Sequence, residues 1–486
     1  MKSHRHQQRA DSQGDRQAPA AVSQPVGTKQ AGEVEPHRAR PGASGWRWAE
    51  ASVWTDRMLT ALEEGVKGGV WYSLNDKVWH RPNLWSAWSE TAANKGSPGV
   101  DGISIADYER DVERNVEYLS KALRDGTYRP QAIRRAHIPK GDGKTRPLGI
   151  PTIRDRIVQG AVRHVMEPIF EKQFAEHSYG FRPGRGCKDA LRRVDQLLKT
   201  GYPYVVDADL KSYFDTIPHD RLMQVIGRDI ADSRLLNLIE QFLQANIMEE
   251  ASTWKPTMGA PQGAVLSPLL SNIYLNDLDH LMARKGYEMV RYADDFVILC
   301  QTQQQAEAAL AEVQQWTAQA GLTLHPEKTR IAHAVTERFE FLGYRFDRGR
   351  KFPRKKSLKK LREAIRERTK RTNGKSMPTI IKSINPVLRG WFKYFQHCYR
   401  TTFPTEDSWI RMRLRSILRR RHGRVGRGRG KDHQRWPNAY FSELGLYSLT
   451  KAHQLAGQSL KGAVDRRVPT HRDKSARPVR REGRPQ

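Results

Sequence analysis

The chain has 486 residues, enough for two or three domains, because a single hydrophobic core rarely grows beyond about 250 residues. Its formal net charge of +31 predicts a polyanionic partner, and residues 347–486 carry most of it, with 39 Lys and Arg against 10 Asp and Glu. The composition argues against a membrane protein, because no run of about 18 apolar residues occurs, and the spacing of Cys187, Cys300 and Cys398 argues against a disulfide framework or a zinc site.

The N-terminal part of the chain divides into three stretches of different pattern. Residues 1–45 are polar and lack the apolar segment of a signal peptide, so we expect a disordered arm. From Trp46 to Trp88, apolar residues recur at helical spacing, which predicts helices. From there to about residue 200, we expect loops rich in Gly and Pro that alternate with short apolar segments.

The middle of the chain alternates between strand and helix patterns. Tyr202–Leu210 is rich in Val and Tyr and ends in acidic residues, which predicts a buried strand. Helices are predicted at about 219–228, 232–247, 266–281 and 304–320.

The clearest local pattern lies at residues 289–299. Two apolar runs, Met289-Val290-Arg291-Tyr292 and Phe296-Val297-Ile298-Leu299, flank Ala293-Asp294-Asp295. Two such runs around a short acidic turn predict a β-hairpin with carboxylates at its tip. Beyond it we expect a short strand pair around residues 341–344 and, after residue 350, a basic helix with a thin apolar stripe.

The acidic residues point to a metal site. Asp207 and Asp209 share one face of the predicted strand, because alternate strand residues point the same way, and Asp294 and Asp295 lie at the hairpin tip. A single Asp at a strand end is most often a turn or cap residue. Two such clusters favour the paired carboxylates with which a polymerase holds two divalent ions about 3.5–4 Å apart.

Two of these segments resemble motifs of a known family. Tyr292-Ala293-Asp294-Asp295 resembles the YxDD box of reverse transcriptases, and Asp209-Leu210-Lys211-Ser212-Tyr213-Phe214-Asp215 resembles their first catalytic motif. The resemblance implies that Asp209, Asp294 and Asp295 are catalytic and bind two Mg²⁺ ions. It gives Asp207 no such role, so we expect Asp207 to support the site or the structure.

Further motifs occur in the order of that family. Lys140 to Pro147 resembles a basic fingers turn, which implies that Lys144 and Arg146 bind the incoming triphosphate. Leu324 to Lys328 resembles a later palm motif, which places Lys328 near the leaving pyrophosphate.

Two more positions are nominated for the nucleotide. Pro261-Gln262-Gly263 resembles the motif that contacts nucleotide and template, which nominates Gln262. Phe214 matches the position of a bulky ring that crowds the sugar, so it would favour dNTPs over NTPs. Phe341 to Tyr344 resembles the primer grip.

Other segments resemble the branch encoded by group II introns. Asn94 to Gly102 and Ser178 to Arg185 resemble blocks of that branch, and Leu388 to Phe395 and Trp436 to Phe441 resemble its maturase, or X/thumb, domain. The segment 419–431 is dense in Arg and Gly, which suits binding to irregular RNA. We expect RNA contacts from its arginines: Arg419, Arg420, Arg421, Arg424, Arg427 and Arg429.

The implied fold is α+β, a right-hand polymerase whose fingers and antiparallel palm sheet are followed by a helical thumb. We expect a disordered arm at 1–45, fingers and palm at 46–345, an RNA-binding thumb or maturase domain at 346–450, and a basic, disordered tail at 451–486. The paired cysteines of an HNH endonuclease, which many relatives carry, do not occur after Tyr447. We therefore expect no DNA cleavage by this chain.

The resemblance implies an RNA-directed DNA polymerase that copies intron RNA and a maturase that assists splicing, together supporting intron mobility. The implied partners are the group II intron RNA, an RNA template with a DNA primer, dNTPs and target DNA, with no membrane and with a homodimer left open. We expect a bacterial cytoplasmic protein that acts at the nucleoid. Two alternatives stay open: a reverse transcriptase without an intron, of the retron, diversity-generating or defence-associated kind, and a splicing-only maturase.

Overall fold

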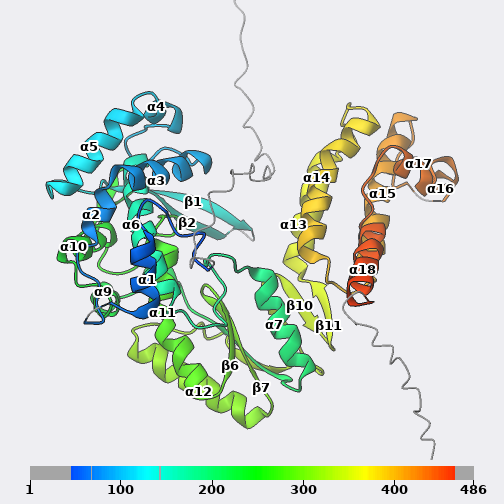
Figure 1. The fold of residues 1–486 in the computed structure, drawn as a ribbon. Helices are drawn as coiled ribbons and strands as arrows, with labels where there is room; N and C mark the ends of the chain where they lie inside the picture. The colour runs from blue at the N-terminus through cyan, green and yellow to red at the C-terminus, as the bar shows by residue number, and fades with distance from the viewer. Residues whose placement is uncertain (1–44, 67, 142–143, 429, 466–486) are drawn as a thin grey trace, which may run out of the picture. The chain divides into compact units, whose positions relative to one another are not determined.

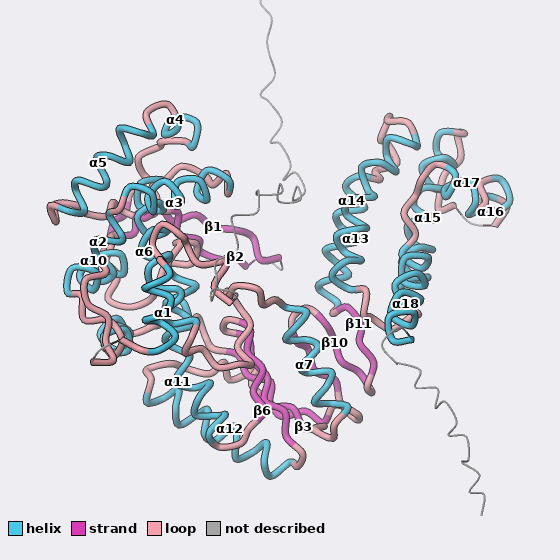
Figure 2. Tube along the Cα trace, in the orientation of Figure 1, coloured by secondary structure: helices cyan, strands magenta, loops and turns pink. Residues whose placement is uncertain are grey.

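A computed structural model of the chain describes residues 45–66, 68–141, 144–428 and 430–465. Helices and strands are mixed, and the strands form three separate sheets among the helices, which confirms the α+β expectation (Figures 1 and 2). The disordered arm expected at residues 1–45 falls outside the described residues, residue 45 excepted.

Short helices form the N-terminal part, as the spacing after Trp46 predicts. The first ends where Gly65 takes a φ of +97°, a conformation that L side chains rarely adopt. The helices are α1 (Asp56–Glu64), α2 (Asn75–Trp79), α3 (Arg81–Ala93), α4 (Ile105–Glu109) and α5 (Val112–Arg124).

The expectation of loops up to about residue 200 is wrong. This stretch also contains the strands β1 (Ile133–Gly141) and β2 (Lys144–Ile150) and the helices α6 (Ile153–Glu171) and α7 (Cys187–Lys199). The helix α6 is buried on nearly every side, so adjacent residues such as Ile157 and Val158 are both fully covered. The less buried residues of α6, Arg154, Arg163, Glu167 and Glu171, form only a narrow polar stripe, so the helical period in the sequence is weak.

A four-stranded antiparallel sheet has the strand order β6-β7-β3-β8 and carries Asp209 and Asp295 on neighbouring strands. Its helices α11 and α12 pack on one face, and α7 packs on the other (Figure 1). The strands are β3 (Tyr204–Asp209), β6 (Glu288–Tyr292), β7 (Asp295–Cys300) and β8 (Arg330–His333), and the helices that follow β3 are α8 (Tyr213–Thr216), α9 (His219–Gly227), α10 (Ser233–Leu243), α11 (Ser267–Arg284) and α12 (Gln303–Gln319).

Two hydrophobic cores cover the two faces of this sheet. Val206 and Ile298 belong to the core that contains α11 and α12. Val205, Val297 and Leu299 belong to a second core, which also contains residues of the C-terminal helices. The strands β3 and β7 are therefore apolar on both faces along most of their length.

The second sheet has the order β2-β1-β4-β5, with β4 (Ile247–Glu249) parallel to β1 and β5 (Ser252–Trp254) antiparallel to β4. The helix expected at 232–247 ends four residues early, at Leu243. The reason is a tertiary contact, because the Asn246 carbonyl accepts from the Ile133 N–H at 2.7 Å and starts the β1–β4 pairing.

The third sheet joins the middle of the chain to its C-terminal helices. It consists of β9 (Arg338–Phe341), β10 (Tyr344–Asp347) and β11 (Arg350–Pro353), in the order β11-β10-β9. The domain boundary expected between residues 345 and 346 falls inside β10, so no linker separates the two regions there. The helices beyond it are α13 (Lys355–Arg368), α14 (Met377–Phe395), α15 (Thr402–Arg421), α16 (Asp432–Arg435), α17 (Asn438–Glu443) and α18 (Leu449–Asp465).

The expectation of a disordered tail from residue 451 is wrong up to Asp465, because α18 continues to that residue. A buried carboxylate on α15 anchors the start of this helix: Asp407 accepts hydrogen bonds from the Ser448 hydroxyl (2.9 Å), the Leu449 N–H (3.0 Å) and the Thr450 N–H (3.1 Å). The remainder of the expected tail, residues 466–486, lies outside the described residues. None of the helices described has the length and apolar character needed to cross a membrane.

Asp407→Ala tests this anchor. Removing the carboxylate leaves three donors at the start of α18 without their acceptor, so we expect a loss of about 1–3 kcal/mol in the free energy of unfolding and faster proteolysis near residue 449. Glu443→Ala, at an exposed acidic residue of α17, is the control. Equal melting temperatures and cleavage rates for the two variants would contradict the anchoring role.

Candidate active site

Asp209, Asp294 and Asp295 come together at one end of the β6-β7-β3-β8 sheet. Asp209 is the register partner of Asp295 in the antiparallel β3–β7 pair. Directly opposed residues of such a pair project from the same face, and Asp207 projects from that face too. Asp294 lies in the turn between β6 and β7. The structure therefore gathers carboxylates that are far apart in sequence.

The turn that carries Asp294 has a strained backbone. Tyr292 pairs with Asp295, so Ala293 and Asp294 alone form the loop. Ala293 has a φ of +60°, a left-handed conformation that costs an L-residue roughly 1–2 kcal/mol. A hydrogen bond of 3.0 Å from the Arg291 guanidinium to the Ala293 carbonyl helps to hold it.

Arg291 is fully buried and ties the hairpin to α11. Its Nε donates to both carboxylate oxygens of Asp279, at 2.8 and 3.0 Å, and a terminal nitrogen donates to Asn272 Oδ1 at 2.9 Å. A buried ion pair is tolerated when hydrogen bonds satisfy its charged groups, as they do here. The position of the turn is thus set by groups on a separate helix.

The segment from Ser178 to Arg185 packs beside this turn, and Gly180 lies where the two backbones approach most closely. The Tyr179 N–H donates to the Arg291 carbonyl at 2.9 Å, and the Asn272 amide donates to the Gly180 carbonyl at 2.8 Å. A Cβ on Gly180 would lie 2.9 Å from the Tyr292 carbonyl carbon and still closer to the Ala293 nitrogen. Only glycine fits this close approach.

Lys328 reaches Asp209 from the segment after α12. The His325 N–H donates to the Asp209 carbonyl at 2.7 Å, and the Lys211 N–H donates to the Thr323 carbonyl at 2.8 Å. These bonds dock the segment on the end of β3, where the Lys328 ammonium forms an ion pair with Asp209 Oδ2. This contact brings Lys328 next to Asp209, and its expected place near the leaving pyrophosphate stays a prediction.

Negative charge at the site is only partly neutralised. Burial raises the pKa of Asp295 to about 7, and the charges of Asp207, Asp294 and Asp209 act in the same direction. Burial likewise raises the pKa of Asp207 to about 6. Burial also raises the pKa of Asp294, while the charge of Arg146 lowers it, so Arg146 lies within electrostatic reach.

The donor chemistry fits a hard divalent cation, because carboxylate oxygens with unneutralised charge are the ligands that Mg²⁺ prefers. In the part of the chain that the structure describes, no three Asp, Glu, His or Cys side chains already form a ligand set for a metal ion. One oxygen of Asp209 is engaged by Lys328. The side chain of Lys144, expected to bind the triphosphate, lies outside the described residues.

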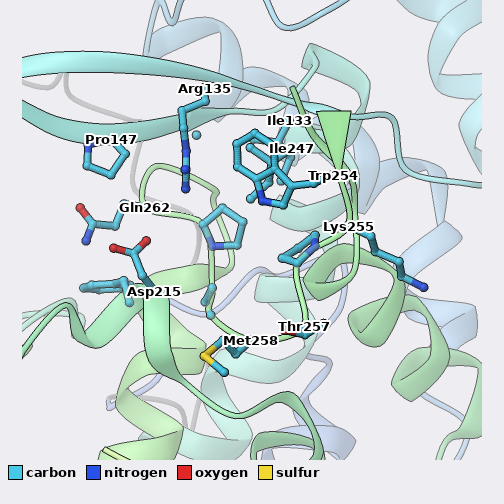
Figure 3. Close-up of a pocket in the computed structure, with 16 residues that line it drawn as sticks. Ile133, Arg135, Pro147, Asp215, Ile247, Trp254, Lys255, Thr257, Met258 and Gln262 are labelled. Atoms are coloured by element: carbon cyan, nitrogen blue, oxygen red, sulfur yellow. The ribbon is translucent and has the colours of Figure 1, made fainter. Parts of the chain in front are cut away.

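Phe214 and Gln262 line a cavity of about 260 Å³ next to α8 (Figure 3). Its floor is shaped by Gly259, whose φ of +92° brings the chain so close that a Cβ would lie 2.9 Å from the Phe214 carbonyl oxygen. The Ala260 N–H donates to that same carbonyl at 2.7 Å. The structure thus places the two nucleotide candidates in one cavity.

Arg135, Asp215 and Trp254 also line this cavity, and the sequence alone did not nominate them as site residues. Figure 3 shows Arg135 extending from β1 into the cavity on the side of Asp215 and Gln262. The Arg135 guanidinium carbon lies 5.0 Å from the centre of the Trp254 ring of β5. Asp215 sits within the first catalytic motif and could have been noticed there, whereas Arg135 and Trp254 meet only through sheet pairing.

The arginines expected to bind RNA fall into different classes. Arg419 forms a 2.8 Å ion pair with Asp432 and donates to the Val425 carbonyl at 2.8 Å, so part of its capacity is used within the fold. Arg421 donates to the carbonyls of Asn373 and Lys375. Three more of these arginines are exposed: Arg420, Arg424 and Arg427. Arg429 lies outside the described residues.

Two protein families match separate parts of the chain. The family described as "Reverse transcriptase (RNA-dependent DNA polymerase)" matches residues 138–346, which contain Asp209, Asp294 and Asp295. The family described as "Group II intron, maturase-specific domain" matches residues 358–436.

Curated relatives agree with these matches. Protein YkfC of Escherichia coli (strain K12) is 37% identical over 301 residues, which cover 54% of this chain and 79% of YkfC. The group II intron-encoded protein LtrA of Lactococcus lactis subsp. cremoris is 40% identical over 201 residues, 41% of this chain and 33% of LtrA. An uncharacterized 91 kDa protein in the cob intron of Schizosaccharomyces pombe is 31% identical over 303 residues, 50% of this chain and 36% of that protein. The match thus spans about a third of the length of the last two relatives.

Gly180→Ala tests the close approach beneath the turn. The added methyl group must displace the backbone of residues 292 and 293, so we expect a loss of about 1–3 kcal/mol in the free energy of unfolding, measured by urea denaturation. Gly186→Ala is the control, because the nearest atom to its added Cβ, Asp189 Oδ2, would be 3.9 Å away. A Gly180→Ala protein as stable as this control would show that the approach is looser than described.

Proposed function

The chain belongs to the reverse transcriptase family and carries the maturase-specific domain of group II introns, and on that premise we propose that it copies its intron RNA into DNA and assists the splicing of that RNA. One observation carries the catalytic half of the proposal: Asp209 is paired with Asp295 across β3 and β7, beside Asp294 in the turn. In this arrangement the carboxylates can act on one growing nucleic-acid end.

Asp209, Asp294 and Asp295 would hold two Mg²⁺ ions, since they are the oxygen donors grouped at the strand ends. When bound, two such ions activate the primer 3′-hydroxyl and stabilise the charge of the transferred phosphoryl group. The protein's own contribution is to bring the three carboxylates together at one end of the sheet. Asp207, two residues before Asp209 on β3, contributes further negative charge there.

Basic side chains would receive the triphosphate. Lys328 pairs with Asp209, and this contact supports the proposal that its ammonium receives the leaving pyrophosphate. The charge of Arg146, on β2, lowers the pKa of Asp294, so Arg146 is within electrostatic reach of the site. Lys144 begins the same strand and is proposed to join Arg146 on the phosphates. Such residues neutralise phosphate charge without taking part in the chemistry themselves.

The cavity with Phe214 and Gln262 would receive the nucleotide and the template base. The Phe214 backbone at the edge of the cavity is held by the 2.7 Å hydrogen bond from Ala260, and its ring is proposed to lie beside the sugar. A fixed ring beside the sugar would leave no room for a 2′-hydroxyl. Discrimination between dNTPs and NTPs would then rest on steric exclusion.

We also propose which part of a polymerase each sheet forms. The β6-β7-β3-β8 sheet is proposed as the palm, and the β1–β2 pair as part of the fingers. The segment around Phe341 to Tyr344, between β9 and β10, is proposed as the primer grip, followed by a thumb and maturase region built from α13 to α18. The shared core between the palm sheet and these helices supports a single working unit.

The positive C-terminal region would bind the group II intron RNA, with Arg420, Arg424 and Arg427 among the contacts. RNA template, DNA primer and dNTPs would meet at the palm, and target DNA would bring the protein to the nucleoid. A reverse transcriptase without an intron is the weaker alternative, because the maturase-specific match covers residues 358–436.

Replacing Asp294 and Asp295 by Ala tests the catalytic assignment. We expect primer extension on an RNA template to fall roughly 10³-fold or more, because the charge that stabilises the reaction is lost, while RNA binding stays near the wild-type level. The control removes two exposed carboxylates elsewhere, in Glu64→Ala with Glu109→Ala. DNA synthesis that survives the first change would refute the assignment.

Phe214→Val tests the sugar contact. A smaller side chain should let ribonucleotides enter, so we expect the ratio of kcat/KM for a dNTP to that for the matching NTP to drop by about 10- to 100-fold. Phe214→Tyr keeps the ring and should keep the ratio. An unchanged preference in the Val variant would mean that another group excludes the 2′-hydroxyl.

A further inference from the structure

A second, strongly cationic cavity lies among the C-terminal helices, away from the carboxylates. It has a volume of about 320 Å³ and is bounded by the C-terminal end of α13 and the middle of α15. No acidic residue is among those that line it, which are Arg366, Thr369, Arg371, Trp409, Met412, Arg413, Ser416 and Arg427. All of them fall within residues 358–436, the span that matches the maturase-specific family.

Trp409 organises the arginines around this cavity. The guanidinium carbons of Arg362, Arg366 and Arg413 lie 5.5, 5.7 and 5.5 Å from the centre of its ring. The face of an indole ring attracts cations, so one ring holds three like charges close together. This concentration of charge is costly unless anions balance it.

Only one of the three arginines has a carboxylate partner in the described structure. Arg362 is bound by the buried Glu406, at 2.6 and 3.0 Å. Arg413 instead donates through Nε to Thr369 Oγ1 at 2.8 Å and through a terminal nitrogen to the Thr369 carbonyl at 2.9 Å. Both acceptors are neutral, so the charge of Arg413 remains while its orientation is fixed.

The surroundings of Arg413 leave its charge uncompensated. Burial lowers the pKa of its guanidinium, and the charges of Arg366 and Arg371 lower it further. Neither Arg366 nor Arg371 forms a side-chain hydrogen bond or ion pair with any residue that the structure describes. Fixed Arg413 and these two arginines, which lack polar partners among the described residues, thus converge on one cavity from α13, α15 and the loop between α13 and α14.

We propose that this cavity is a binding site for a backbone phosphate of the group II intron RNA, gripped by Arg366, Arg371 and Arg413. The assignment rests on the proposed maturase function and locates part of it outside the Arg-Gly segment 419–431. Guanidinium groups suit a phosphodiester because they present paired donors to its oxygens and keep their charge. The phosphate would supply the anion that the fold itself does not.

Arg366→Gln with Arg371→Gln tests the site. Both residues are exposed and lack polar partners within the described structure, so the double variant should fold, which its melting temperature checks. Lys382→Gln with Lys393→Gln removes the same charge from exposed positions on α14 and is the matched control.

The first readout is the affinity for the intron RNA transcribed from the sequence around this reading frame, measured over a range of salt concentrations. We expect Kd to rise at least about tenfold for the arginine variant. Its plot of log Kd against log salt should become shallower by roughly 0.7–0.9 for each phosphate that the variant no longer neutralises. The control should change Kd by less than about threefold.

The second readout separates two sources of the phosphate. Primer extension on a short RNA template without intron sequence should be unchanged in the arginine variant. If primer extension falls while intron affinity holds, the phosphate belongs to the template–primer duplex and the proposal is overturned. Equal RNA affinity for the arginine variant and its control also overturns it. A wild-type protein that fails to bind the intron RNA at all would refute the maturase function, and this site with it.

Discussion

The pairing register between β3 and β7 is the constraint on which the rest of the site depends. Because strand side chains alternate between faces, a slip of one residue would move Asp209 to the opposite face from Asp295. The two cores resist such a slip, since Val205 and Val206 fill different cores on the two faces. Apolar burial on both sides of the sheet therefore fixes where the carboxylates lie, although none of the apolar residues touches a substrate.

The hairpin turn needs separate support, because it lies at the end of the sheet where the cores no longer cover it. Arg291 and its partner Asp279 provide that support from inside, and Gly180 allows a neighbouring segment to pack directly beneath the turn. Burial raises the pKa of Asp295, and the charges of the neighbouring acidic residues raise it further, which is the electrostatic cost of grouping them. A stiff, buried framework therefore holds together charges that repel one another, which is the arrangement that a cation-dependent site requires.

Sequence patterns predicted the strands and turns whose structure depends on residues close to one another in the chain. The hairpin at residues 289–299 follows from two apolar runs around an acidic turn, and the strand ending at Asp209 follows from its own composition. The patterns failed where distant contacts decide the structure. The helix α6 has only a narrow polar stripe to reveal it, and α18 depends on Asp407, which lies more than one helix earlier in the chain. The arginine density around residue 420 likewise revealed neither the Arg419–Asp432 ion pair nor the cavity around Trp409.

The central claim is that Asp209, Asp294 and Asp295 bind the same metal centre. The most direct measurement is a crystal structure of the full chain with Mn²⁺, an RNA template, a DNA primer and a non-hydrolysable dNTP, using the anomalous signal of manganese to locate the metal. The account predicts anomalous peaks within ligating distance of Asp209 and of the turn at residues 294 and 295. Peaks elsewhere, with these carboxylates apart and free of metal, would contradict it.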